Sequence, residues 1–398
     1  MCKEHSVYLA VTMDTKAREA FFLKKEIEDL GHLVKIIDIG TRKKSPEGVE
    51  ITQAQVLDGY LDEAAVCETR SEAARYVTAG LNKIVRKLYE EGRLAALISL
   101  GGSGGSSIAS EAMHQLPLGV PKVIVTTMAS GNTLPYVQGE DILLINPVVD
   151  IQNLNFMTRH VLRQAAAVLD GMLRVSMRKQ SAKAIAITGF GVTTPCVDRC
   201  TELLEAAGYE VLIFHARGIS GGKIMEKMIY EGCFQGVLDI TTSEVADEIC
   251  GGIYGVKDRM LAAVKMGIPY VVVPGALEMI NLSTQDTLEP WQKKRVLYMH
   301  SPSSVKMRAN GADMEKLARV FCDRLGQGSQ NVKLMIPERG FSSVNQKDSV
   351  FYDKNADQIF VETVKKNMPK QISIICDDVH INDPAFAERL VDELLAMM

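Results

Sequence analysis

A loop of glycine and serine residues directly follows an apolar run at residues 94–100. This order predicts a buried strand that turns into a helix. Backbone N–H groups at a helix N-terminus favour an anion, and glycine lets the backbone approach it closely. The spacing lacks the Lys of a P-loop and the third glycine of a dinucleotide fingerprint, so the loop predicts a phosphate site without identifying the ligand. The residues of this cradle are Gly101, Gly102, Ser103, Gly104, Gly105, Ser106 and Ser107.

A carboxylate, a hydroxyl and an ammonium group follow one another at Asp14, Thr15 and Lys16, where the expected strand 7–12 gives way to a helix. We expect Asp14 or Thr15 to face a Mg²⁺ ion and Lys16 to face the phosphates that the ion accompanies. The structural alternative is that Asp14 caps the helix and Lys16 is an exposed lysine of its first turn.

Two more polar positions of the first half follow expected strands. Thr127, Ser130 and Gly131 lie in a loop of small residues, which either holds ribose or phosphate or caps the next segment. Asp150 either binds ribose or metal, or caps the helix expected from residue 155.

Three residues of the second half could form a catalytic group. Cys196 lies at a strand-to-helix turn, where the helix dipole lowers the pKa of a thiol and favours an easily ionised cysteine. His215 ends the next strand and Asp239 belongs to the third. Because strand ends converge, the three could meet as nucleophile, base and orienting group. The alternative is a buried cysteine, a strand-end histidine and a loop-capping aspartate.

A second small-molecule pocket is expected along the same edge of the second half. The glycine loop 218–223 opens a helix and could hold another anion, whereas Glu244 has helix capping as its structural interpretation. His300 and Arg308 bracket a polar loop where a carboxylate or phosphate could bind, although each alone could be a surface residue. The residues expected to contact the substrate are Thr193, Thr194, Ser220, Gly221, Gly222, Thr241, Thr242, Glu244, Asn281, His300 and Arg308.

These positions require elements that bring strand ends together. Short apolar strands alternate with longer helical segments, which predicts parallel sheets covered by helices on both faces. The 398 residues exceed the size of one ordinary core, and the pattern restarts near residue 180. We therefore expect an α/β protein with two domains, residues 1–180 with the predicted phosphate site and residues 181–398 with the expected substrate or effector site.

Charge and composition narrow the class of protein. The formal net charge of −4 at pH 7, without a Lys/Arg stripe that alternates with aromatic residues, argues against a nucleic-acid partner. No apolar run approaches membrane-spanning length, and the polar residues 1–6 give no secretory signal. The 8 cysteines include no CxxC pair, which favours reduced thiols in a cytoplasmic protein and no structural zinc.

Several short motifs are distributed over the whole chain. Those of the first half are residues 12–16 (TMDTK), the glycine loop 101–107 and residues 146–150 (NPVVD). Those of the second half are residues 190–197 (FGVTTPCV), 235–242 (QGVLDITT), 244–248 (EVADE), 337–340 (PERG) and 380–383 (HIND). Together they closely resemble the family that contains the N-terminal region of the tomato mosaic virus resistance protein. The first glycine loop departs from the family pattern, since it ends in Ser-Ser where relatives often have Gly-Thr or Ser-Leu.

The resemblance implies two Rossmann-like domains, a site for ATP and Mg²⁺ in the first, and a homodimer. Most family members are bacterial or fungal and have no assigned reaction. The plant protein has a separate barrel-type domain beyond this region, so its antiviral activity is not expected here. The expected function is that of a cytoplasmic protein that binds Mg²⁺·ATP and activates or phosphorylates a small metabolite. The alternatives are a non-catalytic, nucleotide-responsive regulator, and a thiol or hydrolytic enzyme that uses Cys196 with ATP as regulator.

Overall fold

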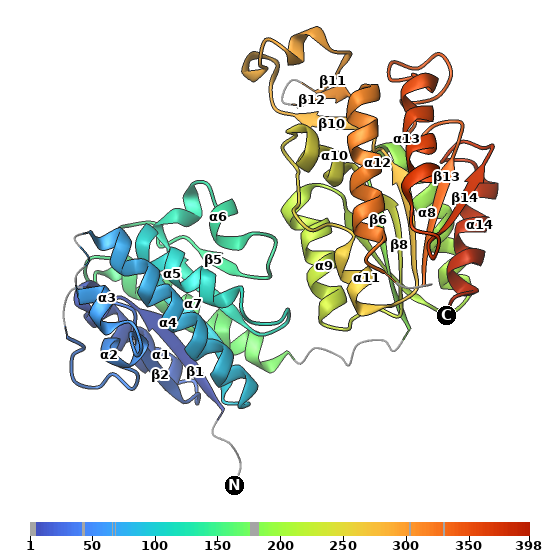
Figure 1. The fold of residues 1–398 in the computed structure, drawn as a ribbon. Helices are drawn as coiled ribbons and strands as arrows, with labels where there is room; N and C mark the ends of the chain where they lie inside the picture. The colour runs from blue at the N-terminus through green and yellow to red at the C-terminus, as the bar shows by residue number, and fades with distance from the viewer. Residues whose placement is uncertain are drawn as a thin grey trace. The chain divides into compact units, whose positions relative to one another are not determined.

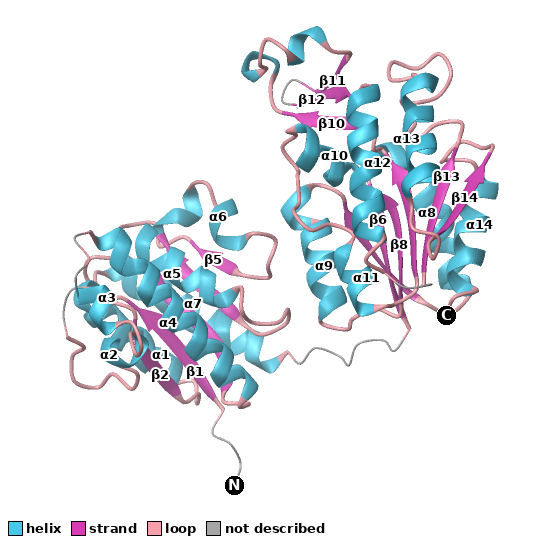
Figure 2. Ribbon diagram, viewed as in Figure 1, coloured by secondary structure: helices cyan, strands magenta, loops and turns pink. Residues whose placement is uncertain are grey.

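The computed structural model divides the chain into two compact units, Met1–Arg178 and Lys179–Met398 (Figure 1). It describes residues 5–41, 44–65, 67, 69–175, 183–301, 304–328 and 331–398. The domain boundary expected at residue 180 lies outside these described residues. Each unit contains a parallel sheet with helices on both of its faces, which confirms the predicted α/β class (Figure 2).

The first unit is built on a five-stranded sheet in the order β2-β1-β3-β4-β5, and every neighbouring pair is parallel. Side chains alternate between its faces: Leu9 of β1 packs among residues of α1 and α7, whereas Tyr8 packs among residues of α4 and α5. Because both faces are covered, the strands are mostly apolar. The strands are β1 (Ser6–Val11), β2 (Val34–Asp38), β3 (Leu94–Gly101), β4 (Lys122–Thr126) and β5 (Leu143–Ile145).

The helices of the first unit begin where the sequence supplies caps. Thr69 and Asn155 accept backbone hydrogen bonds at the starts of α4 and α7, and Thr52 does so at α2. The helix α5 is different, because its N-cap is Gly102 and has no side-chain hydrogen bond. The helices are α1 (Met13–Glu28), α2 (Gln53–Val56), α3 (Leu61–Ala65), α4 (Arg70–Glu90), α5 (Ser103–Met113), α6 (Leu134–Val137) and α7 (Phe156–Arg174), with a 3₁₀ turn η1 at Thr127–Ser130.

The second unit has a six-stranded parallel sheet in the order β14-β13-β9-β8-β6-β7. The helices α8 and α14 cover one face, and α9 to α13 contribute to the core on the other. Its strands are β6 (Ala184–Gly189), β7 (Glu210–His215), β8 (Gly236–Thr241), β9 (Tyr270–Gly275), β13 (Val332–Pro337) and β14 (Ser373–Asp377). Its helices are α8 (Thr194–Ala206), α9 (Gly222–Tyr230), α10 (Ser243–Cys250), α11 (Leu261–Met266), α12 (Gly311–Leu325), α13 (Lys354–Asn367) and α14 (Pro384–Leu395), with 3₁₀ turns η2 (Gly191–Thr193), η3 (Gly218–Ser220), η4 (Gln285–Thr287) and η5 (Gln292–Lys294).

A small antiparallel sheet in the order β10-β12-β11 extends the second unit beyond the carboxyl ends of its main strands (Figure 1). Its strands are β10 (Met279–Leu282), β11 (Leu297–Ser301) and β12 (Ser304–Arg308). The prediction that His300 and Arg308 bracket a polar loop is therefore wrong. They lie on two consecutive antiparallel strands, in which Tyr298 pairs with Lys306 and Arg308 pairs with Met279.

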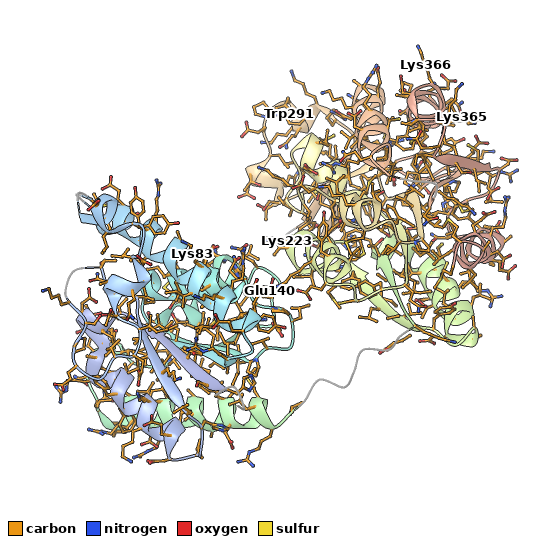
Figure 3. The ribbon with its side chains drawn as sticks, turned by 60° about the horizontal axis from the view of Figure 1, so that its bottom comes forward. Lys83, Glu140, Lys223, Trp291, Lys365 and Lys366 are labelled. Atoms are coloured by element: carbon orange, nitrogen blue, oxygen red, sulfur yellow. The ribbon has the colours of Figure 1, made fainter. Side chains whose placement is uncertain are left out.

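The chain's one tryptophan, Trp291, lies on the second unit and is 50% exposed (Figure 3). Among the helices that the structure describes, none combines the length and apolar character needed to cross a membrane.

Candidate functional site

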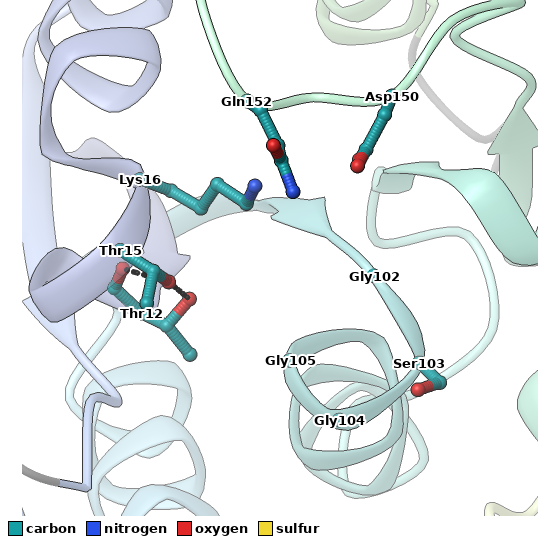
Figure 4. A pocket seen from close by; sticks show the side chains of 9 residues that line it. All are labelled: Thr12, Thr15, Lys16, Gly102, Ser103, Gly104, Gly105, Asp150 and Gln152. Atoms are coloured by element: carbon teal, nitrogen blue, oxygen red, sulfur yellow. Dashed lines mark hydrogen bonds between the residues drawn. The ribbon is translucent and has the colours of Figure 1, made fainter.

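A cavity of about 410 Å³ lies at the carboxyl ends of β1 and β3 in the first unit (Figure 4). Three segments contribute to it: the turn from β1 to α1, the first turn of α5, and the segment after β5. The structure therefore brings the predicted glycine loop and the predicted Thr15–Lys16 pair to one place. The lining residues are Thr12, Thr15, Lys16, Gly102, Ser103, Gly104, Gly105, Asp150 and Gln152.

The first turn of α5 presents backbone donors to this cavity. Ser106 N–H bonds to the carbonyl of Gly102 at 3.1 Å, so the N–H groups of Ser103, Gly104 and Gly105 have no acceptor within the helix. A Cβ at Gly104 would meet no atom within 4 Å, whereas one at Gly105 would lie 3.5 Å from Thr12 Cγ2. Free donors, a helix dipole and open space at Gly104 together make this turn suited to an anion.

Lys16 reaches the cavity because α1 is not regular there. Its φ of −128° and ψ of 20° interrupt the helix, and its N–H and that of Thr15 both bond to the carbonyl of Thr12, at 2.9 and 3.1 Å. The Lys16 ammonium donates to the carbonyl of Ile151. An ammonium has three donors, so two remain for a ligand. The Thr15 hydroxyl, which pairs with Thr12 Oγ1 at 3.0 Å, also lines the cavity.

Asp14 does not line the cavity, which corrects its predicted role beside the phosphates. Its carboxylate accepts a hydrogen bond from Thr41 N at 3.3 Å, and its other oxygen is buried without a partner. Asp150 and Gln152 point into the cavity instead, across from the first turn of α5 (Figure 4). Gln152 was not predicted, because it lies in an irregular segment with no motif of its own.

Other residues of the predicted cradle support the loop without lining the cavity. The Ser106 hydroxyl is buried and pairs with Thr126 Oγ1 at 2.7 Å, which ties α5 to the end of β4. Ser130 donates to the carbonyl of Thr127 at 3.3 Å within η1. Besides Asp14, the predicted residues outside the lining are Gly101, Ser106, Ser107, Thr127, Ser130 and Gly131.

A buried ion cluster occupies the interior of the second unit. The Arg259 guanidinium donates to Asp239, Glu226 and Glu244 at 2.6 to 3.1 Å, and none of it is exposed. Burial opposes the charge of Arg259, but the three carboxylates outweigh that effect and raise its pKa. Burial raises the pKa values of Glu226 and Glu244, and the charge of Arg259 acts in the opposite direction on both.

The second glycine loop binds a carboxylate of the protein itself. Glu244 Oε1 accepts hydrogen bonds from Gly218 N at 2.6 Å and Gly222 N at 3.0 Å. A Cβ at Gly222 would lie 2.0 Å from Glu244 Oε2, and one at Gly221 would lie 1.8 Å from the carbonyl of His215. The predicted anion site at Ser220–Gly222 is therefore filled by Glu244, and Glu244 is a structural residue rather than a substrate ligand.

The predicted group of Cys196, His215 and Asp239 is not assembled. Cys196 is 1% exposed, and a hydrogen bond with Cys200 together with burial raises the pKa of its thiol, so the prediction of an easily ionised cysteine is wrong. Asp239 is fully buried, where it accepts from Arg259 and from the Tyr270 hydroxyl at 2.7 Å. Of the three, His215 lines a cavity of about 640 Å³, and Cys196 and Asp239 do not line it.

Most predicted hydroxyl ligands of the second unit are buried in its interior. Thr193 Oγ1 and Thr241 Oγ1 pair at 2.8 Å, and the Thr242 hydroxyl donates to the carbonyl of Val273 at 3.0 Å. Thr194 is exposed but does not line the cavity that contains His215. These contacts stabilise the carboxyl ends of β6 and β8 and leave no free face for a substrate.

A larger cavity of about 640 Å³ lies between the end of β7 and the strands β10 to β12. The predicted residues His215 and His300 line it. Arg308 does not, because its buried guanidinium donates to Asp357 and to the carbonyls of Phe351 and Ala309.

The sequence analysis missed several residues of this cavity. It also predicted that Asn281 contacts the substrate, whereas Asn281 contacts a lining residue instead. Asn281 is fully buried and acts behind the lining, since its Oδ1 accepts from Lys306 and its Nδ2 donates to Asp247 at 3.0 Å. The alternation of apolar and cationic residues in 304–308 is the signal that could have placed Lys306 on a strand. The lining residues without a prediction include Phe190, Arg217, Tyr254, Tyr298 and Lys306.

The sequence is similar to known families over both units. Models described as the N-terminal and C-terminal domains of Uncharacterised protein family (UPF0261) match residues 5–178 and 182–398. The chain belongs to the UPF0261 family. A UPF0261 protein of Clostridium tetani is 38% identical over 97% of each chain. The ToMV susceptible protein tm-1(GCR26) and the ToMV resistance protein Tm-1(GCR237) of Solanum lycopersicum are 34% and 33% identical over 98% of this chain.

The chain spans 55% of the length of each tomato relative. The predicted resemblance to the family of the tomato protein is confirmed. Among solved structures, a UDP-N-acetylglucosamine 2-epimerase from Rickettsia bellii is 10% identical with a TM-score of 0.23, over 67% of this chain and 78% of its own. That similarity is too low to bear on the function of this member of UPF0261.

Proposed function

We propose that the first unit binds ATP as its Mg²⁺ complex, with the phosphates at the first turn of α5. The observation that carries the proposal is the combination at one cavity of three free helix N–H groups and the Lys16 ammonium. Both kinds of donor are suited to phosphate oxygens, and no side-chain cap of α5 competes for the N–H groups.

The donor set around the cavity also fits a magnesium ion. Mg²⁺ takes oxygen ligands, and in nucleotide sites it is held by one or two protein oxygens together with phosphates and water. Among the oxygens that line the cavity, the Thr15 hydroxyl and the Asp150 carboxylate are the two we propose as metal ligands, whereas Asp14 is directed elsewhere. Within the described residues no group of three or more His, Cys, Asp or Glu could hold a metal, which suits an ion that arrives with the nucleotide.

The cavity is suited to positioning phosphates, which is the main task of a protein in phosphoryl transfer. We therefore infer ATP-dependent activation or phosphorylation of a small metabolite. The second candidate is a nucleotide-responsive regulator without turnover, and steady release of ADP that depends on a metabolite would exclude it. The thiol-enzyme alternative is not retained, since Cys196 is buried and its pKa is raised.

Isothermal titration calorimetry of the full chain with ATP, with and without Mg²⁺, tests the proposal. Lys16→Met should lower the affinity about tenfold or more, because a charge-assisted hydrogen bond is lost. The matched control on the same helix is Lys25→Met, which removes an exposed lysine paired with Asp29 and should leave binding unchanged. Absence of heat from wild-type protein under both conditions would contradict the proposal.

A further inference from the structure

The 640 Å³ cavity of the second unit carries an excess of positive charge. Arg217 comes from the turn after β7 and Lys306 from β12, and both line the cavity. None of the described residues that form its lining is an Asp or a Glu. A cavity with two cations and no carboxylate of its own is complementary to an anion.

Lys306 is held in place by contacts on several sides. The residue is 4% exposed, and its ammonium donates to Asn281 Oδ1. The ammonium lies 5.0 Å from the centre of the Phe190 ring and 5.9 Å from that of Tyr254. The pKa of Lys306 is lowered to about 8: burial is the main cause, the charge of Arg217 acts in the same direction, and Asp247 opposes both. The ammonium is therefore protonated at neutral pH but poorly compensated.

Arg217 shares an aromatic neighbour with Lys306. Its guanidinium lies 4.8 Å from the centre of the Tyr254 ring and donates to the Tyr254 hydroxyl. Because the two cations repel each other, an anion between them would be stabilised by both. A guanidinium also presents paired N–H groups whose geometry matches a carboxylate.

Flat rings form another part of the same cavity. The rings of Phe190 and His215 are stacked with centres 5.3 Å apart and 15° between their planes. Burial lowers the pKa of His215, and the charges of Arg217 and Lys306 act in the same direction, so this imidazole is neutral at pH 7. A neutral stacked pair beside two cations offers an apolar surface next to an anion site.

We infer that this cavity binds a small carboxylate that carries a flat ring. Arg217 and Lys306 bind the carboxylate, and the stacked Phe190 and His215 pack against the ring. The inference goes beyond the proposed function, because it concerns the other unit and requires no nucleotide. The volume is within the ordinary range for a site that encloses a small organic molecule.

Calorimetric titration of the full chain with aromatic carboxylates, namely benzoate, 4-hydroxybenzoate and phenylpyruvate, tests this inference. At least one should bind at millimolar concentration or below, and benzamide, the neutral counterpart of benzoate, should not. Uridine monophosphate is included because it joins a flat ring to a phosphate. Binding of uridine monophosphate without any carboxylate would overturn the assignment, as would no binding by any of the three acids.

Variants then locate the site. Arg217→Gln, at an exposed position, and Lys306→Met should each weaken binding of the carboxylate about tenfold or more. The control is Lys333→Met, which removes a cation of β13 that is paired with Glu393 and should leave the affinity for the carboxylate unchanged. Unaltered binding in Arg217→Gln overturns the inference even if Lys306→Met fails to fold. Lys16→Met should retain carboxylate binding, which separates this result from failure of the nucleotide proposal.

Discussion

The two glycine loops of this protein have similar sequences and opposite environments. At the first turn of α5, three N–H groups face a cavity, and a Cβ at Gly104 would meet nothing within 4 Å. At the start of α9, Glu244 accepts from Gly218 and Gly222, and a Cβ at Gly222 would lie 2.0 Å from its carboxylate. The N–H groups of a glycine loop are suited to an anion, and in the second unit that anion is a carboxylate of the protein itself.

Removal of the internal anion should have the largest effect. Glu244→Ala leaves Arg259 with one carboxylate fewer and two N–H groups unpaired, so we expect a loss of about 3–5 kcal/mol in the free energy of unfolding of the second unit. Trp291 is the chain's one tryptophan, and its fluorescence during urea unfolding reports on that unit. The exposed residue Glu388, paired with Arg199, is the control: Glu388→Ala should cost about 0–1 kcal/mol. Equal losses in the two variants would show that Glu244 is not the anion the loop requires.

A carboxylate placed in the first loop should make it resemble the second. Gly104→Asp adds a negative charge at the first turn of α5, where the helix dipole favours it by about 0.3–1 kcal/mol. The same charge repels phosphate, so we expect the affinity for Mg²⁺·ATP to fall about a hundredfold, or about 2.7 kcal/mol, measured by calorimetry. Gly171→Asp adds the same charge to α7 at another open glycine and should leave affinity unchanged. Retained binding in Gly104→Asp would place the phosphates elsewhere.

Alanine substitutions at Gly104 and Gly222 test whether the space beside each glycine is open or filled. Gly222→Ala should destabilise the second unit by about 1–3 kcal/mol, because its Cβ would displace Glu244 and Arg259. Gly104→Ala should leave the first unit as stable or up to about 1 kcal/mol more stable, since alanine favours helix. Trp291 fluorescence measures the first effect and circular dichroism the second. Similar effects at both positions would remove the distinction between the loops.

The smallest effect concerns the carboxylate proposed for the second unit. Lys306 has a pKa of about 8, so it loses its charge as the pH rises from 7 to 9, and affinity for an aromatic carboxylate should fall about tenfold over that range. Asp247 of α10 lies behind Asn281, and burial raises its pKa to about 7. Its deprotonation adds a negative charge near the cavity, which also lowers the affinity for a carboxylate as the pH rises. Other groups also face the cavity. They are the neutral ring of His215, the guanidinium of Arg217, and the side chains of Tyr298 and His300 on β11.

Calorimetry at several pH values measures this dependence. Lys306→Met should bind more weakly and should lose most of the pH dependence. A wild-type affinity that is constant from pH 7 to 9 would mean that the Lys306 ammonium does not contact the ligand.

The order of strands and helices in both units was predictable, because apolar strands buried on two faces stand out from amphipathic helices. The cavity of the first unit was predictable in part, since the glycine loop and Lys16 both follow strands of one sheet edge. Asp14 was misplaced because its carboxylate accepts from Thr41 N–H, 27 positions along the chain, and no local sequence pattern shows that contact.

The second unit was harder to predict, for a physical reason. Its decisive contacts join residues far apart in the chain: Glu244 reaches Gly218 from 26 positions away, and Lys306 reaches Asn281 from 25. Spacing identifies groups that share a helix or a turn, but the burial of Cys196 and Asp239 depends on which elements pack together. The short strands β10 to β12 were missed because their alternation covers only four or five residues each.

The contact between Glu244 and its loop makes occupation of that loop independent of the solutes in the surrounding solution. An anion attached to the chain has a constant effective concentration, so the loop at α9 is occupied whatever the solution contains. The anion proposed to bind at α5 would come from solution, and it would stabilise the first unit by RT ln(1 + [L]/Kd), about 2.7 kcal/mol at a hundredfold excess over Kd. Under the proposed function, occupation of the loop at α5 therefore follows the supply of its ligand, whereas occupation of the loop at α9 by Glu244 accompanies folding of the second unit itself.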